Sequence, residues 1–235
     1  MSVTIIFLAV LAAVAGWWLS HQRLMSKPWL EEGAVTGYGR TEASQVPAAK
    51  LGLGLFLAVV GVLFAMLISA YLMRRDAGAD WRALPVPPVL FVNTGLIVLS
   101  SLALHWAHVA AGEGNIRDLR SALLTGGVAA AGFLVGQVLA WRQLSAAGYW
   151  LAANPANTFF YLLTALHGLH LLGGLAALGA TTRRAWRSDD ARALRLSVDL
   201  CAIYWHFLLV IWLILFALLM RWVDDLIAMC RPLLG

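Results

Sequence analysis

The sequence has few charged residues and only two cysteines. Charged residues make up 12% of the 235 positions and hydrophobic residues 61%, whereas soluble domains are usually about 25% charged and about 45–50% apolar. This shortage of charge excludes an ordinary soluble globular protein. Cys201 falls in the last apolar stretch and Cys230 in the C-terminal tail, so the cysteines indicate no disulfide framework.

Six stretches are long and apolar enough to cross a bilayer, which takes roughly 20 helical residues. They cover residues 3–20, 51–73, 89–111, 121–141, 158–180 and 196–220. The first stretch lacks the basic segment and the small-residue cleavage site of a signal peptide, so we expect a retained helix. The expected fold class is therefore all-α, a polytopic membrane helix bundle.

The long loop after the first stretch divides the expected bundle into two parts. Residues 1–50 should form an N-terminal transmembrane helix with its cytoplasmic loop, and residues 51–235 a five-helix bundle. Small residues recur at a four-residue spacing, as in Gly132 with Gly136 and Gly173 with Ala177. In lipid this spacing lets helix backbones approach closely, so we expect these residues to lie at packing faces.

Basic residues predict the orientation of the bundle. The loops after the first, third and fifth stretches hold Arg23, Lys27, Arg40, Lys50, Arg117, Arg120, Arg183, Arg184, Arg187, Arg192 and Arg195, and fewer lie on the other side. The positive-inside rule then places these loops in the cytoplasm and both termini outside, in a bacterial-type inner membrane. Since the net charge of +5 is dispersed over loops, we expect no nucleic-acid partner.

Ionisable residues within the apolar stretches are few. They are His105, His108, His167, His170, Asp199 and His206. No Glu, Lys or Arg lies in the middle of a stretch, so the chain offers no carboxylate relay for protons and is a poor candidate for a pump. No motif for a catalytic nucleophile or a thiol metal site is present either, and we expect no catalytic residue and no metal ligand.

Histidines in a membrane raise the question of haem. With a rise of 1.5 Å per residue, His170 and His206 each lie roughly 15 Å from the cytoplasmic ends of their helices, so a haem held by both is geometrically allowed. The favoured interpretation is that the imidazoles bond across helices or to lipid headgroups, at roughly 0.6–2 kcal/mol each. Under that interpretation His170 and His206 lie on facing surfaces of their helices.

Several motifs in one order identify a family. Residues 159–174 read FFYLLTALHGLHLLGG and residues 204–213 read YWHFLLVIWL; residues 90–94 read LFVNT and are followed by Ser100, Ser101 and HWAH at 105–108. These segments resemble subunit III of the haem-copper oxidases, the cytochrome c and quinol oxidase family, over about residues 51–222. The resemblance implies a five-helix subunit III core, here with one extra N-terminal transmembrane helix.

The chain departs from this family at three acidic positions. Where relatives often carry an acid, this sequence has Val60, Ala140 and Leu209. The departures agree with the shortage of charge in the apolar stretches and argue against direct proton transfer by this chain.

The resemblance implies an accessory, non-catalytic subunit of a proton-translocating cytochrome c or quinol oxidase, which works in aerobic electron transport. Such a subunit binds no cofactor, packs directly on oxidase subunit I in a complex with subunit II, and leaves haem and copper to those partners. It holds structural phospholipid and supports proton uptake. The residues expected to bind lipid or to pack helices together are His105, His108, His167, His170, Arg183, Arg184, Trp205 and His206.

Two other functions remain open from the sequence. One is the homologous accessory protein of nitric oxide reductase, which would purify with a partner carrying a cytochrome c domain and non-haem iron. The other is a free-standing b-type membrane cytochrome, whose haem absorbance would disappear when His170 or His206 is replaced by Ala.

Overall fold

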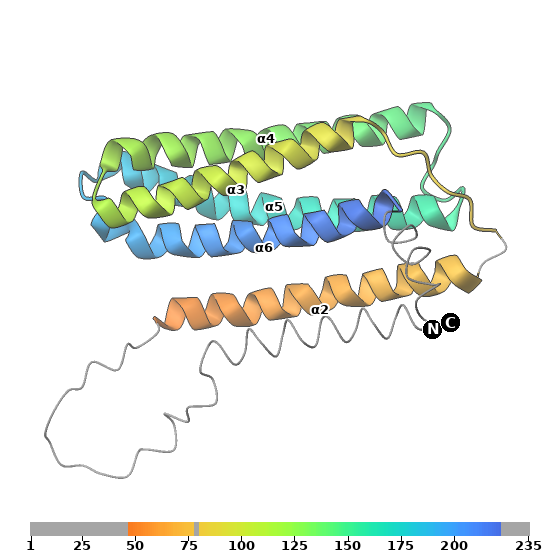
Figure 1. The fold of residues 1–235 in the computed structure, drawn as a ribbon, viewed down its shortest axis with the longest axis horizontal. Coiled ribbons are helices and arrows are strands. Elements are labelled where there is room, and N and C mark those ends of the chain that lie inside the picture. Colours follow the sequence, from red (N-terminus) through yellow and green to blue (C-terminus); the bar gives the residue numbers. More distant parts are fainter. Residues whose placement is uncertain (1–46, 78–79, 222–235) are drawn as a thin grey trace, which may run out of the picture. The chain divides into compact units, whose positions relative to one another are not determined.

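The computed structural model describes residues 47–77 and 80–221. The chain divides into two compact units, Met1–Pro47 and Ala48–Gly235, and the described residues belong almost wholly to the second. This unit contains five long helices: α2 (Ala48–Ala77), α3 (Val89–Glu113), α4 (Ile116–Ala146), α5 (Pro155–Arg187) and α6 (Arg195–Leu219), with a short 3-10 helix η2 (Arg192–Leu194) before α6 (Figure 1). The expected helix at residues 3–20 lies outside the described residues.

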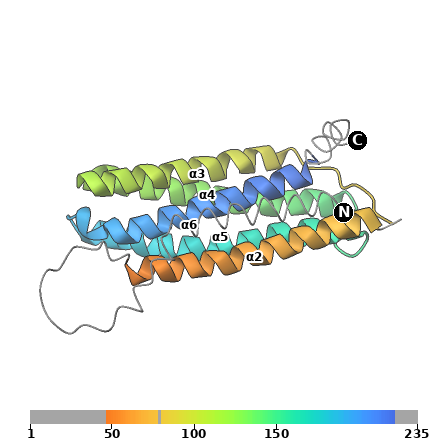
Figure 2. The same ribbon diagram turned by 60° about the horizontal axis from the view of Figure 1, so that its bottom comes forward.

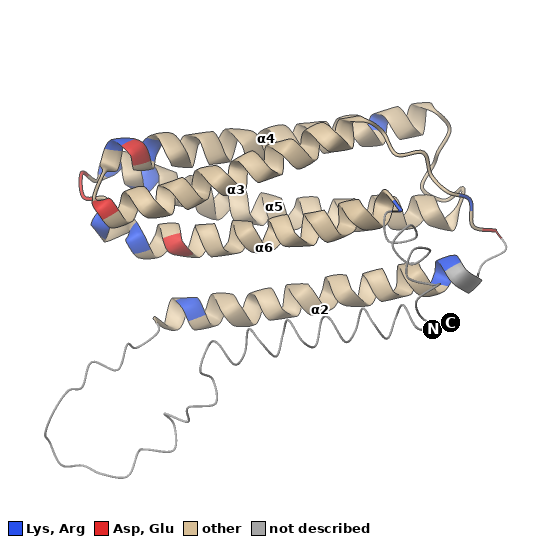
Figure 3. Cartoon of the chain, in the orientation of Figure 1, with Lys and Arg blue, Asp and Glu red and all other residues tan. Residues whose placement is uncertain are grey.

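The five helices alternate in direction and lie roughly parallel in one bundle (Figures 1 and 2). We call the end where α2 begins the Lys50 end; the α3–α4 and α5–α6 connections lie there too. The opposite end, called the Trp81 end, holds the α2–α3 and α4–α5 connections and the end of α6. Charged side chains gather at these two ends and leave the middle of every helix free of Lys, Arg, Asp and Glu (Figure 3). All five helices are long and apolar enough to cross a membrane, and the described residues contain no strand.

Local sequence explains where the helices begin and end. Gly114 closes α3 with a φ of 82°, a left-handed conformation that glycine adopts without steric cost. Asn115 then caps α4 by accepting a hydrogen bond from the Asp118 N–H. Asn154 caps α5 in the same way through the Ala156 N–H, and Pro155 fits the first helical position because no backbone donor is needed there.

Helices α3 and α4 pack closely through small residues. Gly136 lies against the amide of Asn93, where a Cβ atom would collide, and Gly126 lies 3.2 Å, measured from an ideal Cβ, from Leu104. Ser100 on α3 donates a hydrogen bond of 2.7 Å to the Gly126 carbonyl. The predicted packing role of Gly136 is thus confirmed, and close backbone approach allows side-chain bonds across the two helices.

Helix α2 is the most peripheral of the five. The share of its membrane-spanning window that is buried is 22%, against 39–50% for the others. Its main helix contacts are with α5 and α6, and Phe64 is its fully buried anchor. The described core is therefore a four-helix group, α3 to α6, with α2 laid against one side.

Candidate functional site

Six polar residues of the spans form a cluster that begins at the Lys50 end. Its members come from three helices that are far apart in sequence: Lys50 on α2; Ser101, His105 and His108 on α3; and Asp199 and His206 on α6. We call this set the histidine cluster.

Asp199 is the centre of the histidine cluster. One of its carboxylate oxygens lies 2.5 Å from the Lys50 ammonium, and the other contacts His108 Nδ1. The Asp199 side chain is only 15% exposed, so the carboxylate needs partners to lie within a span. One acid therefore joins α2, α3 and α6.

His206 and His105 continue the cluster deeper into the span. His206 Nδ1 lies 2.5 Å from Ser101 Oγ, and its ring centroid is 5.8 Å from that of His105. His105 is in turn 6.2 Å from His108. His105 is exposed and His108 and His206 are half-buried, so the cluster faces the outside of the α3–α6 pair.

The two histidines of α5 lie elsewhere. His167 is fully buried, with its Nε2 atom 3.2 Å from the Leu208 carbonyl of α6 and its ring beside Trp212 and Phe133. His170 bonds to the Leu166 carbonyl within its own helix and packs on Phe64 of α2.

The expectation that His170 and His206 face one another is wrong. His206 turns to Ser101 and His105 on α3, whereas the ring of His170 turns to α2. The side of α6 that meets α5 instead carries Tyr204, whose hydroxyl donates to the His170 carbonyl. The pair therefore does not provide two facing imidazoles for a haem. Among the described residues, no group of three His, Cys, Asp or Glu side chains could hold a metal ion.

Trp205 lies at an apolar groove between α2, α5 and α6. The groove has a volume of about 320 Å³ and is lined by Leu53, Phe56, Gly173, Gly174, Ala177, Leu200, Cys201, Tyr204 and Trp205. Trp205 is fully buried, and its indole N–H has no hydrogen-bond partner within the part of the chain that the structure describes.

The two glycines of this groove differ from expectation. Gly173 has open space where a Cβ would stand, whereas a Cβ on Gly174 would come within 2.8 Å of both Tyr204 and Trp205. The close approach of α5 and α6 therefore uses Gly174, and the predicted packing role of Gly173 is wrong. Gly173 instead widens the groove.

Arg183 and Arg184 are exposed near the end of α5. They lie at the Lys50 end with Arg187, among the charged residues of the α5–α6 connection (Figure 3). The structure thus brings His105, His108 and His206 together, places Trp205 at the groove, and leaves His167 and His170 in separate packing contacts.

Sequence reasoning missed the partner of Asp199 and the role of Ser101. An acid inside a span needs a cation or hydrogen-bond donors nearby. Lys50, at the start of the first described helix, is such a cation, and this requirement could have pointed to it. The choice of Lys50 over the many arginines of the same end depends on tertiary contacts that one sequence does not reveal.

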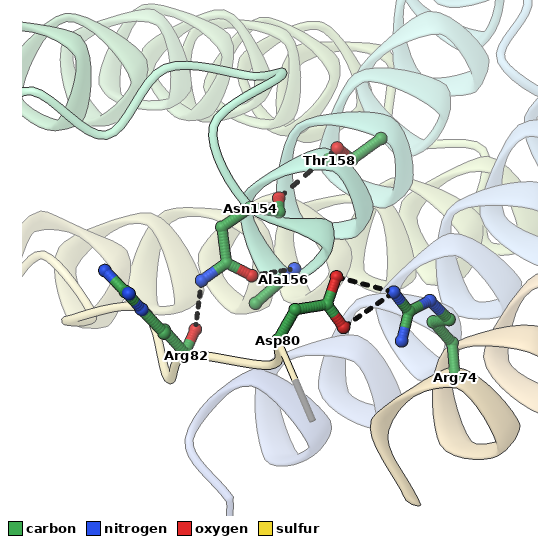
Figure 4. Close-up of polar contacts among 6 residues, drawn as sticks. All are labelled: Arg74, Asp80, Arg82, Asn154, Ala156 and Thr158. Atoms are coloured by element: carbon green, nitrogen blue, oxygen red, sulfur yellow. Dashed lines mark hydrogen bonds and ion pairs between the residues drawn. The ribbon is translucent and has the colours of Figure 1, made fainter. Parts of the chain in front are cut away.

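The α2–α3 connection is held by polar contacts at the Trp81 end. Arg74 donates to both carboxylate oxygens of Asp80 at 2.8 Å, and Asn154 donates to the Arg82 carbonyl at 3.0 Å (Figure 4). The hydrogen bond from Arg74 holds the pKa of Asp80 below its ordinary value of 3.8. These contacts fasten the segment to α2 on one side and to the start of α5 on the other.

Comparison with known proteins identifies the family. The family model described as cytochrome c oxidase subunit III matches residues 2–224. A cytochrome c oxidase subunit 3 from Thermostichus vulcanus is 35% identical over 173 residues, which is 72% of this chain and 85% of that protein. A subunit 3 from a Synechocystis species is 32% identical, covering 71% and 72% of the two chains. The rat subunit 3 is 25% identical over 198 residues.

The geometry agrees with this match, because the family motifs noted in the sequence are the segments that build the α3–α6 core. The Asn93 and Ser100 contacts join α3 to α4, and His167 joins α5 to α6. The chain is a multi-pass membrane protein and belongs to the cytochrome c oxidase subunit III family.

Proposed function

We propose that this chain acts as a non-catalytic subunit that packs directly on the catalytic subunit of the oxidase, holds phospholipid, and supports proton uptake by keeping that subunit intact. Haem and copper then belong to oxidase subunits I and II. The family match supports the place in the complex, and the contacts of the described residues support the role.

The state of Asp199 is the observation that carries the proposal. Among the described spans it is the one carboxylate that lies beyond the first or last turn of its helix. It is bound by Lys50 and His108, so it acts as a structural ion-pair partner that joins helices. A proton relay across the membrane needs titratable groups in series through the whole span. Among the described residues, the series of contacting groups that begins at Lys50 and Asp199 reaches only His105 and His206.

The exposed side of the histidine cluster supports a docking face for subunit I. Ionisable residues in spans almost always face protein or water and seldom hydrocarbon. His105 is exposed on the α3–α6 face, so a partner chain over this face would remove it from lipid. Val135 on α4, which is 61% exposed, is the apolar contrast expected to face lipid.

Photo-cross-linking from these two positions tests the docking face. A benzoylphenylalanine in place of His105 should cross-link to subunit I in the purified complex, and one in place of Val135 should not. Cross-links to subunit I from Val135 alone would contradict the assignment. The same preparation, made in mild detergent, identifies the other chains of the complex and so tests the oxidase role itself.

The groove at Trp205 supports a site for a phospholipid acyl chain. Its lining is apolar, it opens beside the α2 helix, and Arg183 and Arg184 at the same end of the bundle suit an anionic headgroup. Replacing Gly173 by Trp would fill the groove, because that glycine has open space beside it. We expect less co-purified phospholipid from Gly173→Trp and from the double change Arg183→Gln and Arg184→Gln, whereas Leu169→Trp, on an exposed part of α5, should leave the lipid content unchanged.

We also propose that the Lys50 end lies on the cytoplasmic side of a bacterial-type inner membrane, with both termini outside. The end carries Lys50, Arg117, Arg120, Arg183, Arg184, Arg187, Arg192 and Arg195, whereas the Trp81 end carries Arg74, Arg75, Arg82, Arg142 and Arg221. This asymmetry is the one that the positive-inside rule uses.

A further inference from the structure

We propose that the histidine cluster binds a carboxylate of the partner subunit, carried by an Asp or Glu side chain in one of that subunit's transmembrane helices. The inference rests on the docking face proposed for subunit I and names the chemical group that this face receives. Three features of the cluster support it: its charges, the apolar surface around His105, and the depth of His105 in α3.

The histidine cluster has a single anionic group. The Asp199 carboxylate is bound by Lys50 at one oxygen and by His108 at the other. The Lys50 charge balances that of Asp199, and the remaining titratable members of the cluster are its three imidazoles. The cluster is therefore neutral while the imidazoles are neutral and becomes positive when one of them takes up a proton. A second carboxylate would balance that charge.

His105 is the member of the cluster that faces outward. It is exposed, and its ring lies beside those of His206 and His108, with centroids 5.8 and 6.2 Å away. No hydrogen bond of its ring nitrogens is found in residues 47–77 and 80–221. An imidazole has at least one N–H donor, and a donor left without an acceptor inside a span costs free energy. His105 therefore needs an acceptor from outside the described residues.

Apolar side chains surround His105 on the exposed face. Leu102 and Val109 lie one turn to either side of it on α3 and are 63% and 41% exposed, and Ile203, one turn from His206 on α6, is 41% exposed. A partner that covers this face meets an apolar surface with one polar ring in it. Apolar contacts of this kind exclude water from the polar contact that they surround, and a hydrogen bond is stronger where water is excluded.

The depth of His105 excludes the partner backbone as the acceptor. His105 lies about 12 Å along α3 from the end of that helix at Glu113, which places it within the span. A partner segment at this depth is helical, and its carbonyl groups are used by its own backbone hydrogen bonds. The acceptor is therefore a side chain.

A carboxylate is the acceptor side chain that suits the cluster. Its two oxygens can accept hydrogen bonds from two imidazoles at once, and hydrogen bonds to an ionised group are about twice as strong as those between neutral groups. An amide or a hydroxyl would accept from His105 but would leave the charge of a protonated imidazole unbalanced. A carboxylate in a partner span needs donors in turn, and the cluster supplies them.

A carbodiimide cross-link in the purified complex tests for the partner carboxylate. His105→Lys places an amine at this position, and a membrane-permeant carbodiimide activates carboxyl groups for attack by a nearby amine. An amide bond forms at the carboxyl carbon, and the carbodiimide leaves as a urea that carries the carboxyl oxygen. We expect a link from this variant to an Asp or Glu in a transmembrane helix of subunit I, identified by mass spectrometry of the joined peptides.

Leu124→Lys is the matched control. Leu124 on α4 is 53% exposed and lies about 12 Å from the start of α4 at Ile116, so its depth equals that of His105. This variant should give no link to subunit I. In every variant the Lys50–Asp199 pair should be linked within the chain, which shows that the reagent reaches the cluster.

Two further variants decide the matter where His105→Lys does not assemble. His105→Phe keeps a ring and loses the N–H donor, whereas His105→Gln keeps an N–H donor. We expect the Phe variant to dissociate from the complex about tenfold more readily than the wild type, as for the loss of a hydrogen bond to a charged group. The Gln variant should recover much of that difference. Native mass spectrometry of the complex at rising detergent concentration measures both.

The outcomes separate this inference from the proposals on which it rests. An assembled complex in which His105→Lys gives no link to another subunit, or no more than Leu124→Lys gives, would overturn the partner carboxylate. A link only to an acid of this chain, wild-type retention of the Phe variant, or equal losses from the Phe and Gln variants would overturn it too. The docking face fails separately, when benzoylphenylalanine in place of His105 does not link to subunit I, and the oxidase role fails when the purified complex contains no oxidase subunits.

Discussion

Gly173 and Gly174 are adjacent in α5 and have opposite surroundings. A Cβ on Gly174 would lie 2.5 Å from a ring carbon of Tyr204 and 2.8 Å from one of Trp205, whereas nothing lies within 4 Å of a Cβ on Gly173. Trp205 is fully buried.

We therefore expect Gly174→Ala to lower the free energy of unfolding by about 1–3 kcal/mol, because overpacking displaces the α5–α6 contact. Gly173→Ala should leave it unchanged or raise it slightly, since alanine favours the helix over glycine. Thermal unfolding of the two variants in the same detergent measures the difference. Equal losses in both would show that α6 does not approach α5 at Gly174.

Asp80 gives the described chain a pH-dependent contact outside the spans. Because Arg74 lowers the pKa of Asp80 from 3.8, the folded state prefers the ionised carboxyl. The contribution of the Arg74–Asp80 pair to stability is full above the unfolded pKa near 3.8 and is lost as the pH falls through the lower folded value.

Comparison of the wild type with Asp80→Asn tests this dependence. The difference in unfolding temperature between them should be constant from neutral pH down to about pH 5 and should shrink as the pH falls below 3.8. The pair is exposed, so the difference will be small at every pH. A difference that grows on acidification has the wrong sign and would contradict the contact.

At the scale of the helices, α2 has an ion pair at each end and is loosely packed between them. The Lys50–Asp199 ion pair holds its first turn to α6, and the Arg74–Asp80 pair holds its last turn to the connection that follows. Between these two ion pairs, only 22% of its membrane-spanning window is buried.

A double-mutant cycle measures the Lys50–Asp199 ion pair. Lys50→Met leaves Asp199 with His108 as its remaining named partner, so we expect a loss of about 1–2 kcal/mol of unfolding free energy. Adding Asp199→Asn removes the carboxylate charge that has lost Lys50, and the double variant should lose less than the sum of the single changes. Additive losses would show that Lys50 and Asp199 do not interact.

Apolar run length predicted the helices well and their ends less well. The stretch at 51–73 became α2 (Ala48–Ala77), and the stretch at 121–141 became α4 (Ile116–Ala146). The spans extend because polar terminal residues continue a helix once a cap such as Asn115 satisfies its first N–H groups. Hydropathy detects only the part of a helix that lies in hydrocarbon.

The sequence predicts which types of residue form the candidate site, but it does not predict which of them contact one another. That Asp199 and the histidines need partners follows from their place in a span. Which partners they find depends on how each helix is rotated about its axis, and a helix with apolar residues on all sides carries little signal for that rotation. The His170 and His206 expectation failed for this reason, because equal depth does not imply facing directions.

At the scale of the whole chain, the charge asymmetry between the two ends predicts the topology. Ala193 in the α5–α6 connection and Ala152 in the α4–α5 connection are both exposed and lie at opposite ends. With Cys201 and Cys230 replaced by Ser, Ala193→Cys should react with a membrane-impermeant maleimide only after the cells are opened, whereas Ala152→Cys should react in intact cells. Labelling of Ala193→Cys in intact cells would invert the topology.

The placement of α2 has a consequence for biosynthesis. Its main contacts are with α5 and α6, which leave the ribosome after it, and Lys50 meets its carboxylate only when Asp199 on α6 has been made. We therefore expect helix α2 to enter the membrane early and to dock on α6 only after α3, α4 and α5 have been inserted. A nascent chain that stops at Leu194 should hold α2 without its α6 contacts, and an engineered disulfide between α2 and α6 should form only in chains long enough to include α6.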